Sequence, residues 1–262
     1  MSVTLSAEQT AYRSSGTGPP ELLFVHGWGG SGVYFDETIA ALDLAHVRAT
    51  TLDLAGHGES PGGDGGWALE SIDEAILSVA DAIGAKRSVL LGFSMGGKFV
   101  QHFALRHPDR VAGLILVAGT QASPIPLPPE LLADWYGRAG DADGIKEMVS
   151  TFLTGPVDED AFDRFGREFA RIPRAALEGS LQTTIETDFS GELEHLDVPT
   201  LVVAGARDEF FTVDLLRATI ASLIPRARMA TVDCGHEIPL ERPRELAALV
   251  EAFLAGLGPL GL

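Results

Sequence analysis

Residues 88–106 read SVLLGFSMGGKFVQHFALR, and this stretch decides the fold. Its first half is a short apolar run typical of a strand buried on both faces, and its second half has helical periodicity. Gly92, Ser94 and Gly96 form a G-x-S-x-G pattern between the halves, at the strand–turn–helix junction that a nucleophile elbow requires. The glycines give clearance in this tight turn, and the turn lifts the Ser94 hydroxyl above the strand ends. The stretch therefore predicts a nucleophilic serine at the carboxyl edge of a parallel sheet.

Apolar runs and helical patterns alternate on both sides of this stretch. Further strand-like runs occupy 22–26, 47–54, 111–118, 200–205 and 228–232, and helical patterns occupy 33–42, 67–83, 95–107, 213–223 and 243–254. This alternation is typical of a mostly parallel sheet with helices on its faces. It stops between 121 and 195, where a proline-rich exit precedes helical patterns. We therefore expect an α/β core of residues 1–120 and 196–262, interrupted by a helical cap at 121–195.

Composition narrows the class of protein. The 262 residues are 45% hydrophobic and 21% charged, as in ordinary globular proteins. Lys and Arg number 19 against 37 Asp and Glu, and the net charge of -18 argues against a nucleic-acid partner. The single cysteine, Cys234, excludes an intrachain disulfide framework and a multi-cysteine metal site. Without an apolar span or a signal-peptide pattern, the sequence predicts a cytoplasmic protein with no membrane partner.

The glycine-rich stretch before the elbow allows a competing interpretation. Gly27, Gly29 and Gly32 match G-x-G-x-x-G after a strand-like run, and Asp53 ends the next run, as in a dinucleotide-binding site. The motif is short and permissive, and residues 53–58, DLAGHG, form a second tight turn that such a site does not need. We therefore expect no cofactor. No histidine pair at i, i+4 with an acid is present either, so we expect no metal site.

A serine nucleophile needs a base and the base needs an acid, because a free hydroxyl is a poor nucleophile at neutral pH. In a fold with this elbow the chain order is serine, acid, histidine. His236 follows the last strand-like run and is the predicted base. His26 could line the site, but it precedes Ser94 and would require the opposite order.

The predicted acid is Asp208, just beyond the run at 200–205. It competes with Glu209, Asp188 and Asp233, and its place at the end of a strand favours it. Cys234 is expected to be a small buried residue and not a nucleophile, because no histidine–cysteine spacing competes with the serine elbow.

The oxyanion of an acyl-transfer intermediate needs N–H donors near the nucleophile. The backbone N–H of Met95 follows Ser94 directly, and that of Trp28 lies in the loop after the first buried run, the usual second source. We predict these two groups as the oxyanion hole. The glycines around Trp28 then serve close approach to Ser94 and not a cofactor.

Five motifs together resemble the α/β-hydrolase family. They are His26-Gly-Trp-Gly-Gly30, Asp53-Leu-Ala-Gly-His-Gly-Glu-Ser60, Gly92-Phe-Ser-Met-Gly-Gly97, Gly205-Ala-Arg-Asp208 and Gly235-His236. The resemblance covers roughly residues 15–120 and 196–256. It implies an eight-stranded, mostly parallel sheet flanked by helices, a Ser-Asp-His triad and a helical cap. Serine at position 94 argues against the dehalogenase and epoxide-hydrolase branches, whose nucleophile is a carboxylate.

The expected activity is hydrolysis of a small-molecule carboxylic ester through an acyl-enzyme. Trp28, Trp135 and Phe152 are the predicted substrate-binding residues, since aromatic walls suit an acyl or aryl group. The same triad serves lactone hydrolysis, carbon–carbon bond hydrolysis and cofactor-free perhydrolysis. The spacing of the triad residues in the sequence does not distinguish these activities from ester hydrolysis. An alternative to an enzyme is a ligand receptor that has the same fold and turns its ligand over slowly.

A narrower likeness is to the pimeloyl-carrier-protein methyl ester esterases. It rests on the His-Gly-Trp-Gly stretch, on the length of the cap, and on arginines 164, 167, 171 and 174. These arginines have near-helical spacing and could dock an acidic acyl carrier protein as a partner. Acidic residues between them favour the alternative of a solvated charged face.

Overall fold

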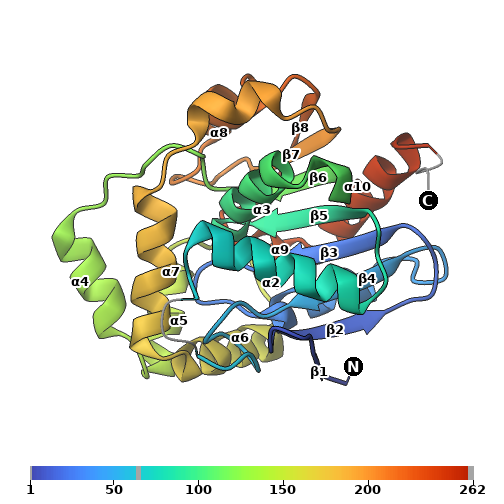
Figure 1. Ribbon diagram of the computed structural model, residues 1–262. Coiled ribbons are helices and arrows are strands. Elements are labelled where there is room, and N and C mark those ends of the chain that lie inside the picture. The colour runs from blue at the N-terminus through green and yellow to red at the C-terminus, as the bar shows by residue number, and fades with distance from the viewer. Residues whose placement is uncertain (1, 63–65, 259–262) are drawn as a thin grey trace.

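An eight-stranded sheet forms the centre of the molecule in the computed structural model, which describes residues 2–62 and 66–258 (Figure 1). Its strand order is β1-β2-β4-β3-β5-β6-β7-β8. β1 and β2 pair antiparallel and the other six strands run parallel. The predicted mostly parallel sheet is confirmed. The strands are β1 Thr4–Leu5, β2 Ala11–Ser15, β3 Glu21–Val25, β4 Arg48–Leu52, β5 Ser88–Phe93, β6 Val111–Val117, β7 Thr200–Gly205 and β8 Ala227–Val232.

The six apolar runs correspond to β3 to β8, with ends that differ by at most two residues. β1 and β2 have no apolar run in the sequence because they are short and incompletely buried. They extend the sheet beyond β4. The alternation of the central strands places Leu22 and Phe24 in one core and Leu23 and Val25 in the other.

Helices cover both faces of the sheet. α1 and α10 pack on one face, and α2, α3 and α8 contribute to the core of the other. Two expected helices are divided: 33–42 becomes η1 and α1, and 213–223 becomes α8 and the π-helical η4. The helices are η1 Gly32–Phe35, α1 Asp36–Ala40, α2 Leu69–Ala82, α3 Met95–Arg106, η2 Pro108–Arg110, α8 Val213–Leu216, η4 Arg217–Ala221, α9 Ile238–Glu241 and α10 Pro243–Gly256.

The chain between β6 and β7 is helical. Figure 1 shows α4 to α7 grouped beside the carboxyl ends of the parallel strands. Asp141 and Asp158 accept hydrogen bonds from the first turns of α5 and α6 and so define where these helices begin. The elements are α4 Pro129–Gly137, α5 Ala142–Ser150, α6 Glu159–Arg171, α7 Arg174–Glu186 and η3 Ser190–His195.

No helix within 2–62 and 66–258 combines the length and apolar character that crossing a membrane would require.

Candidate active site

Ser94 lies at a sharp turn between β5 and α3. Its φ of 48° is in the left-handed region, an unfavourable conformation for a residue with a side chain. The Ser94 N–H donates to the carbonyl of Val117 at 2.9 Å, and the Ser94 carbonyl accepts from Thr120 N–H at 2.9 Å. A Cβ on Gly92 would overlap the backbone of Gly96, so the turn requires glycine there. These constraints fix the half-buried hydroxyl above the end of β5.

His236 connects Ser94 to Asp208. Its Nε2 lies 3.0 Å from the Ser94 Oγ, and its Nδ1 lies 2.8 Å from the Asp208 Oδ2. An ionised carboxylate can only accept, so Nδ1 carries the proton and Nε2 is left to accept from the serine. The structure thus brings the predicted nucleophile, base and acid into one hydrogen-bonded chain.

Asp208 is held by its own loop as well. Its Oδ1 accepts from the backbone N–H groups of Phe210 and Phe211, both at 2.9 Å. Burial opposes ionisation, yet these bonds and the bond from His236 outweigh it and lower the pKa of Asp208. The carboxylate therefore stays ionised at neutral pH and keeps the imidazole in the acceptor tautomer.

The pKa of His236 is raised above its usual 6.5. Burial alone would lower it, but the hydrogen bond and charge of Asp208, with the charges of Glu237 and Glu241, outweigh burial. The imidazolium is therefore more stable here than it would be in water, which suits a neutral imidazole that has to take a proton from serine.

The loop that carries His236 is tied to the chain between α5 and α6. The His236 N–H donates to the Phe152 carbonyl at 3.1 Å. Buried Glu241 accepts from Gly235 N–H at 2.9 Å with Oε1 and from Thr154 N–H at 3.0 Å with Oε2. The position of the base therefore depends on residues outside the sheet.

The two predicted oxyanion donors, Trp28 and Met95, line the same pocket as Ser94. Met95 begins α3, so its N–H has no partner within the helix. The structure records no acceptor for the Trp28 N–H among the residues that it describes. A Cβ on Gly27 would lie 3.2 Å from the Ser94 Cβ, which shows how closely this loop approaches the serine. Trp28 is anchored by its indole N–H, which donates to the Leu177 carbonyl at 2.9 Å.

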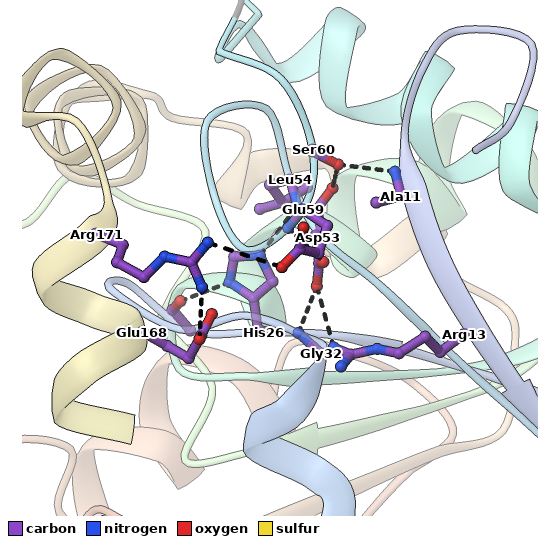
Figure 2. A network of polar contacts seen from close by, with 11 residues as sticks. Ala11, Arg13, His26, Gly32, Asp53, Leu54, Glu59, Ser60, Glu168 and Arg171 are labelled. Atoms are coloured by element: carbon purple, nitrogen blue, oxygen red, sulfur yellow. Dashed lines mark hydrogen bonds and ion pairs between the residues drawn. The ribbon is translucent and has the colours of Figure 1, made fainter. Parts of the chain in front are cut away.

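Asp53 holds the far end of the same loop (Figure 2). Its Oδ1 accepts from Gly32 N–H at 2.6 Å, and its Oδ2 accepts from Glu59 N–H at 3.0 Å. Arg13 lies 3.6 Å from the same carboxylate, whose side chain is 2% exposed. Both oxygens of Asp53 are therefore occupied by protein groups. The dinucleotide interpretation would require this carboxylate to bind a ribose hydroxyl, for which it is not available.

His26 lies at the start of the loop that carries Trp28. Among the described residues, no hydrogen bond joins it to Ser94. Its Nε2 accepts from Leu54 N–H at 3.0 Å, and its Nδ1 lies 2.8 Å from the Gly27 carbonyl. Burial lowers the pKa of His26 to about 4, so the ring is neutral and Nδ1 is the donor. Figure 2 shows this ring between the two turns that it joins.

A mostly aromatic and aliphatic pocket opens at Ser94 and His236. Trp28, Trp135 and Phe152, which the sequence singled out, all line it. The pocket also includes residues that sequence reasoning missed. Those with aromatic or acidic side chains are Tyr34, Phe93, Phe165, Phe169, Phe210, Phe211 and Glu237.

The competing acids and the cysteine lie elsewhere. Glu209 and Asp188 are exposed, and Asp233 is 82% exposed and pairs with Arg207 at 3.0 Å. Cys234 is buried, and burial raises the pKa of its thiol to about 12, so a thiolate does not form at neutral pH. Among the described residues, no group of three or more His, Cys, Asp or Glu side chains is arranged to hold a metal ion.

Three of the four arginines noted in the sequence form ion pairs on the surface. These pairs are Arg164 with Glu37 at 3.3 Å, Arg171 with Glu168 at 3.1 Å, and Arg174 with Glu178 at 2.6 Å. This arrangement is typical of a solvated charged face.

Residues 20–172 match the profile of the family described as alpha/beta hydrolase fold. The chain belongs to the α/β-hydrolase family. A pimeloyl-[acyl-carrier protein] methyl ester esterase of Aeromonas salmonicida is 30% identical, with 90% of this chain and 95% of the relative covered. A 2-hydroxy-6-oxononadienedioate/2-hydroxy-6-oxononatrienedioate hydrolase of Cupriavidus pinatubonensis is 29% identical, with 96% and 94% covered.

Solved structures agree with this assignment. A hydrolase from Pseudomonas aeruginosa superposes with a TM-score of 0.82 at 28% identity, with 97% of each chain covered. One of the two relatives named here is a methyl ester esterase and the other is a hydrolase, so membership of the family supports hydrolase activity for this chain.

Proposed function

We propose that this α/β-hydrolase is a serine esterase that cleaves a carboxylic ester through an acyl-enzyme. The proposal rests on one observation, the hydrogen-bonded chain from Ser94 through His236 to Asp208 at an apolar pocket. A buried acid, a neutral imidazole and a hydroxyl in this order are the groups that nucleophilic acyl transfer needs.

In the acylation half, the Ser94 Oγ attacks the ester carbonyl while its proton moves to the His236 Nε2. The negative charge on the resulting tetrahedral oxyanion is met by the backbone N–H groups of Trp28 and Met95. The intermediate collapses when the carbon–oxygen bond to the alcohol breaks, and the imidazolium returns its proton to the departing alkoxide. The alcohol leaves, and the acyl group stays on Ser94.

Deacylation repeats these steps with water. His236 takes a proton from the water as the hydroxide oxygen attacks the acyl carbonyl, and the second tetrahedral intermediate releases the Ser94 oxygen. That oxygen recovers the proton from His236, and a carboxylic acid is released. Asp208 remains ionised throughout and stabilises the imidazolium.

Residues 121–195 act as the cap in this proposal. Trp135 and Phe152 come from this segment and line the pocket, where Trp135 packs 5.4 Å from Trp28 between ring centroids. We propose that Trp28, Trp135 and Phe152 enclose the substrate and exclude water from the acyl group. Aromatic surfaces of this kind favour an apolar acyl or aryl ester.

A carbon–carbon bond hydrolase is the second candidate. It is supported by the 29% identical relative from Cupriavidus pinatubonensis, whose name specifies hydrolysis of a 2-hydroxy-6-oxo acid. Both activities would use the same Ser94 and His236, so they differ in the leaving group and not in the nucleophile.

The test is stopped-flow hydrolysis of p-nitrophenyl esters of increasing acyl length, beside a 2-hydroxy-6-oxo-2,4-dienoate. An esterase whose acyl-enzyme forms faster than it is hydrolysed gives a burst of p-nitrophenol close to one equivalent. Ser94→Ala should abolish the burst, whereas Ser222→Ala, which alters an exposed serine, should keep it. Full turnover in Ser94→Ala would refute the nucleophile, and turnover of the dienoate alone would favour the second candidate.

A carrier-protein ester is a further substrate to include, because relatives that carry that activity in their names are 27% to 30% identical. The expected partner is an acyl carrier protein. Arg167 is the member of the four-arginine set for which no ion pair is recorded among the described residues. Preference for the carrier-bound methyl ester over the free methyl ester, lost in Arg167→Ala, would support docking.

A further inference from the structure

The pocket contains one acidic side chain that the proposed mechanism does not use. Glu237 follows His236 directly and is 7% exposed, yet it lines the pocket together with Ser94. Its Oε2 accepts a hydrogen bond from the hydroxyl of buried Tyr34, which belongs to η1 and also lines the pocket. Within the described residues, Tyr34 is the one hydrogen-bond donor recorded for this carboxyl. A carboxyl with so few partners in an apolar wall is unusual and calls for an explanation.

The pair is held rigidly by its surroundings. The Tyr34 ring stacks on Phe93 with centroids 4.9 Å apart, and it packs against Phe165 at 5.3 Å. Glu237 lies just before α9 and is fixed by the same loop that holds His236. The carboxyl therefore cannot easily swing out to water when a substrate enters.

The charged groups around Glu237 are mostly acidic. Its charged neighbours are His236, Asp208 and Glu241, of which two are acids. Burial is the main reason that the pKa of Glu237 is raised, and the charges of Asp208 and Glu241 act in the same direction, so the carboxyl carries its charge only at a pH above that raised pKa. The described residues that line the pocket include no lysine or arginine, so an entering carboxylate would find no permanent cation. It would lose its hydration without compensation and would approach an acid.

We propose that Glu237, oriented by Tyr34, is the specificity-determining residue that makes the pocket select substrates by charge, disfavouring an acyl chain with a second carboxylate and accepting a neutral or cationic one. This inference rests on the proposed function, because it concerns the substrate of the same serine. The ligand class is an ester of a monocarboxylic acid whose acyl chain is apolar or carries a positive group. The aromatic wall would add cation–π attraction for a quaternary ammonium.

Two matched pairs of p-nitrophenyl esters isolate the charge. In the first pair the acyl chain is adipate, ending in a carboxylate, or its monoamide, which has the same shape and no charge. In the second pair it is 6-(trimethylammonio)hexanoate or the isosteric 7,7-dimethyloctanoate. The quantity measured is the ratio of kcat/KM within each pair. Effects of a variant on the common chemical steps cancel in these ratios.

At a pH above the raised pKa of Glu237, the wild type should prefer the amide to the carboxylate by on the order of tenfold or more, because charges interact strongly in a poorly solvated pocket. Glu237→Gln keeps the side-chain size and removes the charge. It should raise the ratio of kcat/KM for the carboxylate ester to that for its amide, called the carboxylate ratio. It should lower the ratio for the ammonium ester to that for its neutral isostere, called the ammonium ratio. Opposite changes are the signature of charge, since a steric effect moves both ratios in the same direction. Tyr34→Phe, which frees the carboxyl to reorient, should reduce both preferences partly.

Glu209→Gln is the matched control. It removes an equal charge from an exposed residue that does not line the pocket, and both ratios should stay unchanged. Unchanged ratios in Glu237→Gln, or ratios that move together, would overturn the proposal. Equal shifts in Glu209→Gln would also overturn it, because selection would then come from the net charge of the protein.

A binding measurement separates this inference from the proposed function. The N-(4-nitrophenyl) amides of the same acyl chains bind without depending on hydrolysis, and the nitrophenyl group should quench the fluorescence of Trp28 and Trp135 in the pocket. In a Ser94→Ala background, the carboxylate amide should bind at least tenfold more weakly than the neutral amide, and Glu237→Gln should narrow the gap. If the carboxylate amide binds more weakly than the neutral amide but no ester is hydrolysed by the wild type, the esterase proposal is refuted and the charge selection is not. Equal binding would sink the charge selection alone.

Discussion

The Nε2 of His236 lies 3.0 Å from the Oγ of Ser94, although the two residues are 142 positions apart in the chain. They meet because β5 and β8 are strands of one parallel sheet, so that the loops after both strands emerge at the same edge. Asp208 follows β7 and reaches the same edge by the same rule. The sheet topology thus brings Ser94, His236 and Asp208 close together, and the loops that carry them determine the exact distances between their side chains.

Replacing the acid should test its role in orienting the base. Asp208→Asn removes the acceptor for Nδ1–H, so the imidazole can adopt the tautomer that cannot take the serine proton. We expect kcat for an activated ester to fall by roughly 10⁴-fold, the size seen when a triad acid is neutralised. Asp233→Asn, which changes an acid that is 82% exposed, should leave kcat within twofold. A loss of less than tenfold in Asp208→Asn would show that Asp208 does not act as the acid.

The dependence of activity on pH should report His236. Only the neutral imidazole can act as base, and its pKa is raised above 6.5. We therefore expect kcat/KM to fall as the pH drops through a value above 6.5, while Asp208, with its lowered pKa, stays ionised. Asp208→Asn removes the main influences that raise this pKa, so its residual activity should decline only at lower pH. An inflection that stays in place in the variant would contradict the assignment.

Lys98 should prove important for stability although it is charged. It lies on α3 and is fully buried, and its Nζ donates to the carbonyls of Ser123 at 3.3 Å, Thr184 at 2.8 Å and Thr187 at 2.6 Å. Lys98→Met would remove the donor from these three carbonyls, which belong to one buried and two partly buried residues, so we expect the free energy of unfolding to fall by about 2 kcal/mol. Lys86→Met, at an exposed position, should change it by less than about 0.5 kcal/mol in urea denaturation. Equal effects would mean that the three carbonyls do not need Lys98.

Asp53 should stabilise the loop that carries Trp28. Asp53→Asn keeps the shape but replaces one acceptor oxygen by a donor, so either Gly32 N–H or Glu59 N–H loses its partner. We expect a loss of about 2 kcal/mol in the free energy of unfolding. The exposed Asp109→Asn serves as the control and should be neutral. Thermal unfolding followed by circular dichroism measures both, and an unchanged transition in Asp53→Asn would be inconsistent with this role.

The sequence predicted those parts of the molecule whose signals are local. Glycine spacing and a strand–helix junction located Ser94, and strand ends located His236 and Asp208, because a parallel sheet sends all its carboxyl ends to one edge. β1 and β2 were missed because Thr4–Leu5 and Ala11–Ser15 are short and largely polar. The polar side of the pocket was missed for another reason.

Tyr34 and Glu237 show why that part could not be predicted. They are 203 positions apart, and neither belongs to a motif that specifies a partner. Their contact depends on how η1 and the loop before α9 are packed at the edge of the sheet. Adjacency to His236 was the one signal that could have directed attention to Glu237.

The bond from the His236 N–H to the Phe152 carbonyl has a consequence for recombination between relatives. A chimera that exchanges the whole helical insertion would replace the backbone that supports the imidazole together with the walls of the pocket. Grafts with crossover points on either side of residues 152–154, so that the host keeps this short stretch and its bonds to Glu241, should retain the geometry of the base. Exchange of the insertion should therefore change the substrate range without loss of catalysis only when residues 152–154 of the host are kept together with its sheet.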